Sequence, residues 1–420
     1  MYLDEVVAAQ KRGEARGIVS ICSAHPWVLK AAMRGSISPV LIEATCNQVN
    51  QFGGYTGMNP AGFVRYVREI AEENNFPLEH IILGGDHLGP SVWQDESAEV
   101  AMGKAEVLVR DYVEAGFFKI HLDCSMRLGD DPEGALEVDV SAWRATQLAE
   151  IAESVAAEYH SAPHYVIGTE VPVPGGAREH EEGVSVTKVE DARQTIEVTR
   201  EAFYRAGLGS AWDRVIAVVV QPGVEFGDDF VLPYHPKAAQ GLSTFIESQP
   251  MVYEAHSTDY QTREALGNLV RDHFAVLKVG PALTYAFREA VFALAKMEDE
   301  LIPSEERSNI LSVLDEVMLE NPKHWAKYYH GSAAEQAFKR RYSLSDRIRY
   351  YWTHPAVERA FEKMLMKLDQ TSLPMTFVKQ LVPDVYAIVG ESGAVTAEQI
   401  LLAKIQNVLG DYADACNMAA

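Results

Sequence analysis

Eight short apolar segments, separated by helical patterns, constrain the fold of this chain more than any other feature. They are rich in Val and Ile, and several are apolar without alternation, as in strands that are buried on both faces. The eight predicted strands are Gly17–Ser23, Pro39–Ala44, His80–Gly84, Phe118–Asp123, His164–Glu170, Arg214–Gln221, Met251–Ala255 and Phe274–Val279. Helical patterns occupy Asn59–Asn75, Ala98–Ala115, Ala142–Tyr159, Val189–Ala206, Pro236–Glu247 and Thr262–Asp272.

This alternation predicts an α/β protein, and its length favours a (β/α)8 TIM barrel, which typically takes ~250 residues. A doubly wound sheet is the competing architecture, but it would more naturally show a GxGxxG turn after its first strand, and none is present. Beyond Val279 long helical patterns dominate, such as Leu283–Leu301 and Ser308–Glu320. We therefore expect a barrel over residues 1–285 and a C-terminal helical extension over residues 286–420, packed rigidly on it because no linker separates the two.

The composition argues against several classes of binding partner. The 37 basic and 60 acidic residues give a net charge of −23, which argues against nucleic-acid binding and requires any phosphate-binding cation to be local. The four cysteines form no CxxC pair, and the polar N-terminus has no apolar signal core. No apolar run approaches the ~20 residues that span a bilayer. We expect a cytoplasmic protein with no membrane or nucleic-acid partner.

Polar side chains stand where the predicted strands end. In a TIM barrel the catalytic residues project from the carboxyl ends of the strands, and an unpaired carboxylate at a buried strand end is costly. In chain order these candidates are Ser23, His25, Glu43, Asn47, Asp86, His87, Asp123, Glu170, Gln221, His256, Ser257, Asp259 and Gly280.

Four of these residues predict a metal site with two nitrogen and two oxygen ligands: His87, Glu170, Gln221 and His256. Imidazole and oxygen ligands suit Zn²⁺, Mn²⁺, Co²⁺ or Ni²⁺ and disfavour a thiolate-type site. Asp86 stands beside His87 as a proton carrier. Each residue also has a structural interpretation: loop or helix caps for Asp86 and His87, an exposed acid at a turn for Glu170, an amide at a strand end for Gln221 and a core histidine for His256.

Three further features carry weaker signals. His121 lies inside a predicted strand, and we expect it in the core. Residues 51–57 form a Gly-rich loop beginning at Gln51 that could shape a polyol or phosphate pocket, whereas the absence of GxxxxGK[ST] excludes a P-loop kinase. Residues 341–352 concentrate arginines and aromatics; either they pack as a helix, or Arg347 or Arg349 clamps a phosphate through its guanidinium fork.

Long segments of the chain resemble one family, the GatZ/KbaZ family. Its members are subunits of D-tagatose-1,6-bisphosphate aldolase, and the family includes stand-alone D-tagatose-6-phosphate 4-epimerases. The resemblance covers nearly the whole chain. It is carried by CSAHP (Cys22–Pro26), IEATCNQVNQFGGYTGM (Ile42–Met58), ILGGDHLGP (Ile82–Pro90), KIHLD (Lys119–Asp123), YVIGTEVPVPGG (Tyr165–Gly176), VVQPGVEF (Val219–Phe226), EAHSTDYQT (Glu254–Thr262), LKVGPALT (Leu277–Thr284) and YSLSDRIRYYW (Tyr342–Trp352).

The family's relationship to class II aldolases implies a metal-dependent barrel. Asp86-His87 is similar to the acid–histidine pair of those enzymes, His256 to their later metal histidine, and Lys278–Thr284 to their phosphate loop. Gln221 stands where the aldolases carry another metal histidine, which puts ordinary bisphosphate aldolase activity in doubt. The resemblance therefore leaves two functions open, an epimerase and a subunit that stabilises a separate catalytic aldolase subunit.

Chemistry favours the epimerase. Carbon 4 of a 2-ketose is β to the carbonyl, so its C–H is not acidic enough for enolisation, and no motif for a nucleotide cofactor is present to support oxidation. Retro-aldol cleavage and re-addition with a divalent metal remains, with Asp86 and Asp123 as acid and base. The predicted substrate, a phosphorylated ketose, would be bound by Ser23, His25, Glu43, Asn47, Gln51, Ser257, Asp259, Gly280 and Arg347. A homo-oligomer is left open.

Overall fold

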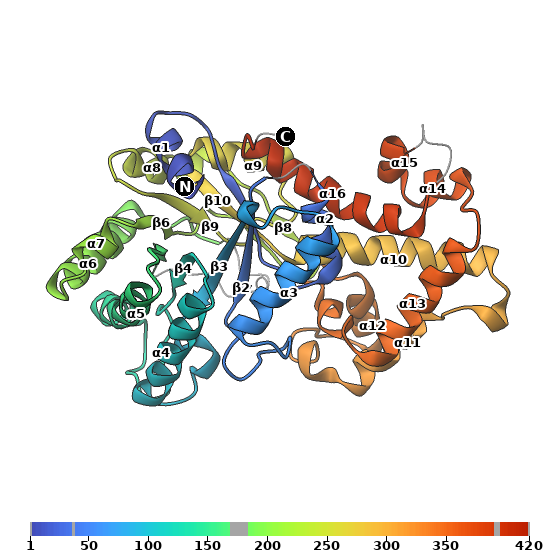
Figure 1. Ribbon diagram of the computed structural model, residues 1–420, viewed down its shortest axis with the longest axis horizontal. Helices are drawn as coiled ribbons and strands as arrows, with labels where there is room; N and C mark the ends of the chain where they lie inside the picture. The colour runs from blue at the N-terminus through green and yellow to red at the C-terminus, as the bar shows by residue number, and fades with distance from the viewer. Residues whose placement is uncertain (1, 36–37, 169–183, 390–394, 419–420) are drawn as a thin grey trace.

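The computed structural model contains a closed barrel of eight parallel strands surrounded by helices (Figure 1). It describes residues 2–35, 38–168, 184–389 and 395–418. Around the barrel the strands follow the order β1-β10-β9-β6-β5-β4-β3-β2, so β1 closes the sheet by pairing with both β10 and β2. The predicted TIM barrel is confirmed.

The barrel strands coincide with the eight predicted apolar segments. Their interiors are buried on both faces, as expected for parallel strands that lie between helices and a packed barrel interior. The strands are β1 (Ile18–Ile21), β2 (Val40–Thr45), β3 (Ile81–Leu88), β4 (Lys119–Leu122), β5 (His164–Ile167), β6 (Val215–Val219), β9 (Val252–Ala255) and β10 (Phe274–Val279). A small antiparallel pair, β7 (Glu225–Phe226) and β8 (Val231–Leu232), follows β6 and was not predicted.

The outer helices bury their apolar faces against the strands. Those of the barrel are α1 (Tyr2–Lys11), α2 (Pro26–Met33), α3 (Pro60–Glu73), α4 (Ala98–Glu114), α5 (Val138–Glu158), α6 (Val189–Arg205), α7 (Gly209–Trp212), α8 (Pro236–Glu247), α9 (Arg263–Arg271) and α10 (Pro281–Leu301). Pro60 begins α3 with Asn59 as its cap, the Asn59 side chain accepting a bond from the Gly62 N–H.

The C-terminal part is helical and leaves the barrel before returning to it (Figure 1). It contains α11 (Ile310–Glu320), α12 (Ala333–Tyr342), α13 (Pro355–Asp369), α14 (Met375–Leu381), α15 (Pro383–Val389) and α16 (Ala397–Ala415). The last helix, α16, packs against α10, α9 and α2. The end of the extension therefore belongs to the outer helical layer of the barrel, while the boundary at residue 285 stays a prediction.

One segment of the extension, residues 343–352, lies across the loops at the carboxyl ends of the strands. Leu344 forms hydrogen bonds with two of these loops. Its N–H donates to the Asp228 carbonyl at 2.8 Å, and its carbonyl accepts from the Tyr260 hydroxyl at 2.6 Å. Trp352 packs edge-on to His25, and the rings of Tyr350 and Tyr55 lie 4.9 Å apart. The extension thus covers part of the barrel mouth, where active sites of this fold lie.

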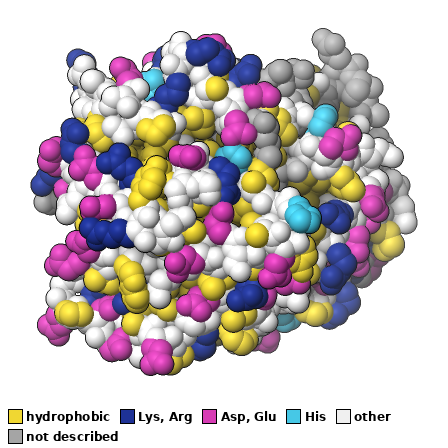
Figure 2. Space-filling view, turned by 60° about the vertical axis from the view of Figure 1, so that its left-hand side comes forward, with side chains coloured by type: hydrophobic (Ala, Val, Ile, Leu, Met, Phe, Trp, Pro, Cys, Tyr) yellow, Lys and Arg dark blue, Asp and Glu magenta, His cyan; other side chains and the backbone are white. Residues whose placement is uncertain are grey.

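None of the helices within the described ranges is both long and apolar enough to cross a bilayer. On the face in Figure 2, acidic and basic side chains are interspersed rather than gathered by sign.

Candidate active site

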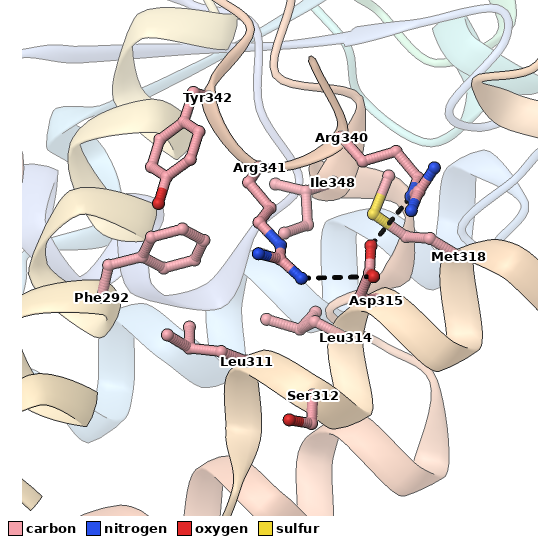
Figure 3. A pocket seen from close by; sticks show the side chains of 10 residues that line it. All are labelled: Phe292, Leu311, Ser312, Leu314, Asp315, Met318, Arg340, Arg341, Tyr342 and Ile348. Atoms are coloured by element: carbon pink, nitrogen blue, oxygen red, sulfur yellow. Dashed lines mark hydrogen bonds and ion pairs between the residues drawn. The ribbon is translucent and has the colours of Figure 1, made fainter. Parts of the chain in front are cut away.

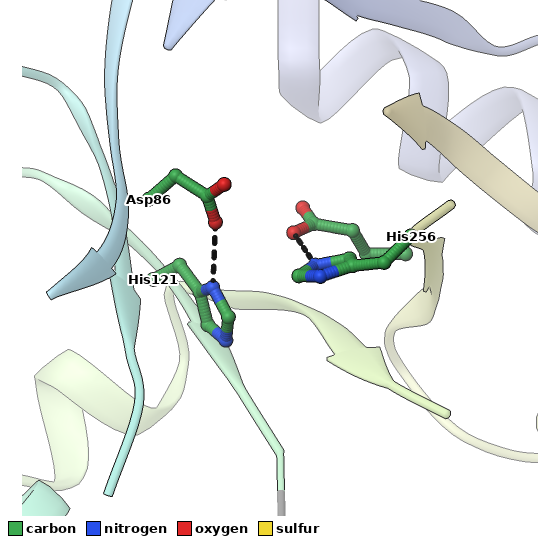
Figure 4. A group of neighbouring side chains, drawn as sticks. Asp86, His121 and His256 are labelled. Carbon is green, nitrogen blue, oxygen red and sulfur yellow. Dashed lines mark hydrogen bonds and ion pairs between the residues drawn. The ribbon is translucent and has the colours of Figure 1, made fainter. Parts of the chain in front are cut away.

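Three histidines meet in the barrel interior near the carboxyl ends of the strands. His87 belongs to β3, His121 to β4, and His256 directly follows β9. Their ring centroids are separated by 4.9 to 5.3 Å, so the three rings form a nearly equilateral triangle. All three side chains are almost completely buried. Figure 4 shows two of them, His121 and His256, facing each other across the site.

Each of these rings is held by a carboxylate through one of its nitrogens. A carboxylate on one ring nitrogen fixes the orientation of the ring and leaves the other nitrogen for a ligand, an arrangement common around metals in proteins. The three pairs are His87 Nδ1 with Asp123 Oδ2 at 2.8 Å, His121 Nδ1 with Asp86 Oδ1 at 2.9 Å, and His256 Nε2 with Glu254 Oε1 at 2.9 Å.

His121 has a second neighbour at the same nitrogen. The backbone N–H of His87 also points at Nδ1, at 3.2 Å. One ring nitrogen cannot donate and accept at once, and the shorter contact to the charged carboxylate decides that Nδ1 carries the proton. The other nitrogen, Nε2, is then a bare acceptor, and it is buried without a hydrogen-bond partner.

Beneath the histidines lies a layer of buried ion pairs. Lys119 places its ammonium 2.7 Å from both Glu43 Oε1 and Glu254 Oε2. Lys278 contacts Asp86 directly and lies 3.2 Å from Glu254 Oε1. Gly84 makes room for this layer, since a Cβ at that position would lie 2.7 Å from Cγ of Glu43. The two lysines therefore offset the three carboxylates in a space that water does not reach.

The mutual charges decide the protonation states. Burial opposes ionisation of Asp86, but the charges of His87 and Lys278 outweigh it and hold the pKa of Asp86 well below its ordinary value. Burial likewise opposes the ionised Glu254, and Lys119 and Lys278 hold its pKa well below the usual range. Both carboxylates are therefore ionised at neutral pH.

The pKa values of His256 and His87 are shifted in opposite directions. Burial, reinforced by the charge of Lys278, lowers the pKa of His256 to about 3, so this ring is neutral at pH 7. Burial also opposes protonation of His87, but Asp86 and Asp123 outweigh it and raise its pKa. A neutral imidazole is the form that ligates a metal, and a nearby cation would displace the proton of His87.

The residues present fit a divalent metal ion. Asp86, His121, Glu254 and His256 each offer a ligand atom, and these four atoms lie within 4.8 Å of one another. The uncompensated Nε2 of His121 supports the same conclusion, because a buried acceptor without a partner is costly unless something binds it. Nitrogen and oxygen donors suit Zn²⁺ and its neighbours in the first transition series.

The cluster differs from the four ligands predicted from the sequence. His256 is shared, and His87 lies beside the cluster. Glu170 lies outside the described residues. Gln221 uses its side-chain oxygen to accept bonds from the N–H groups of Gly223 at 2.7 Å and Val224 at 3.1 Å, so it stabilises its own loop. Its role as a metal ligand stays a prediction.

Of the two predicted acid–base groups, Asp86 has the freer oxygen. Its Oδ2 has only long contacts, 3.7 Å to His87 Nε2 and 3.9 Å to Cys22 Sγ. Asp123 is fully engaged, because Oδ2 holds His87 and Oδ1 accepts from the backbone N–H and hydroxyl of Ser125. This geometry suits Asp86 for proton transfer and Asp123 for orienting His87.

The predicted substrate residues are dispersed over the mouth and the interior. Glu43 lies in the ion-pair layer, and the hydroxyl of Ser23 accepts a bond from the His25 N–H at 3.2 Å. The ring of His25 packs on Phe287, and burial lowers its pKa to about 3.

The remaining predicted substrate residues divide between surface, loop and extension. Asn47 is exposed, and Gln51 turns away to donate to the Lys104 carbonyl at 2.9 Å. Ser257 adopts a positive φ of 54° at the strand end, and Asp259 accepts bonds from the N–H groups of Gly280 and Ala282. Arg347 lies in the extension with its guanidinium over the Tyr328 ring.

Sequence reasoning missed four members of the site: Lys119, His121, Glu254 and Lys278. For the first three, the sequence signal is the two-residue period of a strand, because side chains two residues apart point to the same side. Lys119 and His121 precede Asp123 by steps of two, and Glu254 precedes His256 in the same way. Polar residues in such a register inside an apolar strand indicate a polar barrel interior.

A cavity of about 180 Å³ lies in the extension, away from the histidines (Figure 3). It is bounded by α10, α11 and α12. Arg340 and Arg341 line it, but both pair with Asp315, at 2.8 and 3.4 Å. Its charged groups are thus paired with one another.

Comparisons with known proteins agree with this fold and identify the family. The family model described as "D-tagatose-1,6-bisphosphate aldolase subunit GatZ/KbaZ-like" matches residues 3–417. Curated proteins named D-tagatose-1,6-bisphosphate aldolase subunit GatZ are 51% identical over 419 residues in Salmonella gallinarum and 52% identical over 421 residues in Klebsiella pneumoniae, each covering 99% of both chains.

Two solved structures are also similar. A Sinorhizobium meliloti protein titled "probable tagatose 6 phosphate kinase" superposes with a TM-score of 0.88 at 47% identity, covering 96% of this chain and 100% of that one. The fructuronate-tagaturonate epimerase UxaE of Cohnella laeviribosi has a TM-score of 0.50 at 11% identity, covering 96% and 81%, which shows a shared fold alone. From the first residues of α1 to the end of α16, the chain belongs to the GatZ/KbaZ-like family of D-tagatose-1,6-bisphosphate aldolase subunits.

Proposed function

We propose that this protein is itself an enzyme, which interconverts D-tagatose 6-phosphate and D-fructose 6-phosphate by inversion at carbon 4. One observation carries the proposal: three buried histidines, each oriented by its own carboxylate, lie together in the barrel with their ring centroids 4.9 to 5.3 Å apart. Such an assembly is expensive to bury, and a purely structural interior would be more stable if it were apolar.

We propose the three histidines as the metal ligands, which adds His87 to His121 and His256 of the four-residue cluster. His87, His121 and His256 would hold a divalent ion through the ring nitrogen that its carboxylate leaves open, with Asp123, Asp86 and Glu254 as the outer partners. When bound, the ion would polarise the carbonyl and the adjacent hydroxyl of a 2-ketose. Glu254 is a poorer ligand than the histidines, because both of its oxygens already contact Lys119, Lys278 or His256.

The protein's own groups then move the proton. Asp86 Oδ2 removes the proton from the hydroxyl on carbon 4, and the bond between carbons 3 and 4 breaks to give an enediolate of three carbons and an aldehyde of three carbons. The aldehyde rotates and accepts the enediolate on its opposite face, and Asp86 returns the proton to the new alkoxide. Atoms and charge balance, and no redox partner is needed. Residues 343–352 cover the mouth and would retain the aldehyde.

A second candidate has its own support. The curated relatives are named as subunits of the bisphosphate aldolase, and these names favour a role beside a separate catalytic subunit. In that role the protein would stabilise its partner and turn over nothing by itself. These names support this candidate more directly than the epimerase.

The test uses the purified chain alone. D-tagatose 6-phosphate is incubated with Zn²⁺, Mn²⁺, Co²⁺ or Ni²⁺, and with a chelator, and followed by carbon-13 NMR. The epimerase predicts metal-dependent formation of fructose 6-phosphate that Asp86→Asn abolishes, while Asp315→Asn, a carboxylate of the extension, leaves it intact. No turnover with any metal, together with a rise in activity of a co-expressed aldolase subunit, would refute the epimerase and support the second candidate.

A further inference from the structure

The described part of the extension contains a cationic cluster whose members form no ion pair within the described residues, in a chain whose net charge is −23. Its members are Lys323, His324, Lys327, Arg347 and Arg349. They act on one another electrostatically, since burial and then the charges of Lys323 and Arg347 lower the pKa of His324. Elsewhere in the described chain most buried arginines face a carboxylate, such as Arg144 with Asp131 at 2.6 Å.

Arg349 is the member of the cluster that is held in place but not neutralised. Its guanidinium donates to the Asp346 carbonyl at 3.1 Å, to the Ser345 carbonyl and to the Tyr350 hydroxyl at 2.9 Å. These acceptors are uncharged, and within the described ranges no carboxylate oxygen lies at ion-pair distance from Arg349. Asp346 turns its carboxylate away, to Arg288 at 3.1 Å and Thr284 at 2.6 Å.

A chain of contacts connects Arg349 to the proposed reacting centre. The hydroxyl of Tyr350 accepts a hydrogen bond from Arg349. The ring of Tyr350 lies 4.9 Å from the ring of Tyr55, which belongs to the Gly-rich loop after β2. In the same loop, Gln48 donates to the Cys22 carbonyl at 3.3 Å. The thiol of Cys22 in turn lies 3.9 Å from Asp86 Oδ2. Arg349 is therefore linked, through Tyr350 and the segment that follows β2, to the residues that surround Asp86.

The N-terminus of α10 is the alternative site for an anion, but its N–H groups already donate to a carboxylate. The first N–H groups of α10 follow strand β10, where the resemblance to class II aldolases places a phosphate loop. Here Asp259 Oδ1 accepts from the Gly280 N–H at 3.0 Å and from the Ala282 N–H at 2.8 Å. A phosphate at this helix end would lose those donors to Asp259 and meet the charge of its carboxylate.

Arg347, the other of the two arginines that the sequence offers as phosphate ligands, is engaged within the extension. Its guanidinium lies over the Tyr328 ring and donates to the His324 carbonyl at 3.1 Å. Its side chain is buried, whereas Arg349 is only half-buried. Arg347 thus supports the positive field of the cluster, and Arg349 is placed to contact a ligand.

We infer that Arg349, with the hydroxyls of Tyr350 and Tyr55 beside it, binds the phosphate of the substrate. The inference rests on the proposed function insofar as the ligand is a phosphorylated ketose. A guanidinium presents two parallel N–H donors to phosphate oxygens and remains charged at all working pH values. The extension then has a defined role, because it supplies the cation that the acidic barrel lacks.

The test measures binding without turnover. A hexitol 6-phosphate and the corresponding free hexitol lack the carbonyl, so the metal-loaded protein can bind them but cannot cleave them. Titration calorimetry of the wild-type chain should show the phosphate ester binding roughly 10–100-fold more tightly. Arg349→Gln should remove this preference without weakening the free hexitol, and Arg349→Lys should restore part of it.

Arg341→Gln is the matched control, since Arg341 is an exposed arginine of the same extension. It should keep the full preference. Retention of the preference in Arg349→Gln, or its absence in the wild type, would overturn the inference. If Arg349→Gln loses the preference for the phosphate ester without any fall in melting temperature, misfolding is excluded as the cause. If Arg349→Gln melts at a lower temperature, the partial preference expected of Arg349→Lys becomes the deciding measurement. A protein that binds the ester through Arg349 but turns over no ketose would refute the proposed epimerase and leave this inference standing.

Discussion

Replacing Lys119 by methionine should destabilise the protein strongly although the two side chains have nearly the same size. Lys119 is completely buried, with its ammonium 2.7 Å from Glu43 and from Glu254. The variant leaves two buried carboxylates without that partner. Removing one member of a buried ion pair typically costs about 3–5 kcal/mol, because the remaining charge keeps its desolvation penalty.

This free-energy cost can be converted into an expected fall in melting temperature. An unfolding entropy of about 2.1 cal/mol/K per residue gives the 420-residue chain about 0.9 kcal/mol/K. Lys119→Met should therefore melt roughly 3–6 °C below the wild type in calorimetry at pH 7 and a fixed scan rate. Lys104→Met is the control: Lys104 lies 2.6 Å from Glu96, but both side chains are about one-third exposed, and the change should stay within about 1 °C.

The pH dependence provides a second signature. The lowered pKa of Glu254 contributes stability that is present above its unfolded pKa near 4.5 and is lost as the pH falls through the folded value. The deficit of Lys119→Met should therefore shrink as the pH falls, because without Lys119 the folded-state pKa of Glu254 lies higher and this carboxylate is protonated earlier in the variant. A variant within 1 °C of the wild type at pH 7, or a deficit that does not change with pH, would refute the ion-pair layer.

Three further outcomes follow from the site. His121→Gln should abolish tight Zn²⁺ binding in a competition titration with a chromophoric chelator, and unchanged affinity would remove His121 from the ligand set. Asp123→Asn should weaken Zn²⁺ binding about 10–100-fold, since it changes only the outer partner of His87; a loss as large as that of His121→Gln would make Asp123 itself a ligand. Burial raises the pKa of Asp259 to about 6, above the unfolded 3.8, so this group contributes stability at low pH that is lost as the pH rises through 6. The stability of the wild type relative to Asp259→Asn should then fall by about 3 kcal/mol between pH 4 and pH 7, and a flat difference in urea unfolding would contradict the raised pKa.

The barrel could be predicted because its signals are local. Each strand is an apolar run bounded by turns, and every predicted segment contains or overlaps an observed strand. The return of α16 to the layer between α9 and α2 could not be predicted, because helical periodicity specifies a buried face but not the surface that covers it.

The site was predicted where it depends on position along a strand, and missed where it depends on packing. Asp86, His87 and His256 stand near strand ends, and the structure brings them together. Gln221 also stands at a strand end, but its loop turns the amide onto Gly223 and Val224. His121 resembles a core residue in sequence; only the closed barrel shows that Asp86 holds one of its nitrogens and leaves the other bare.

The assembly of three histidines and three carboxylates is tested most directly by anomalous diffraction. Crystals of the wild-type protein loaded with Zn²⁺ are measured on both sides of the zinc absorption edge. The structure predicts one strong peak about 2.0–2.1 Å from a ring nitrogen of each of His87, His121 and His256. A peak bound by Glu170 and Gln221 without His121, or no peak in the barrel at saturating Zn²⁺, would contradict the account.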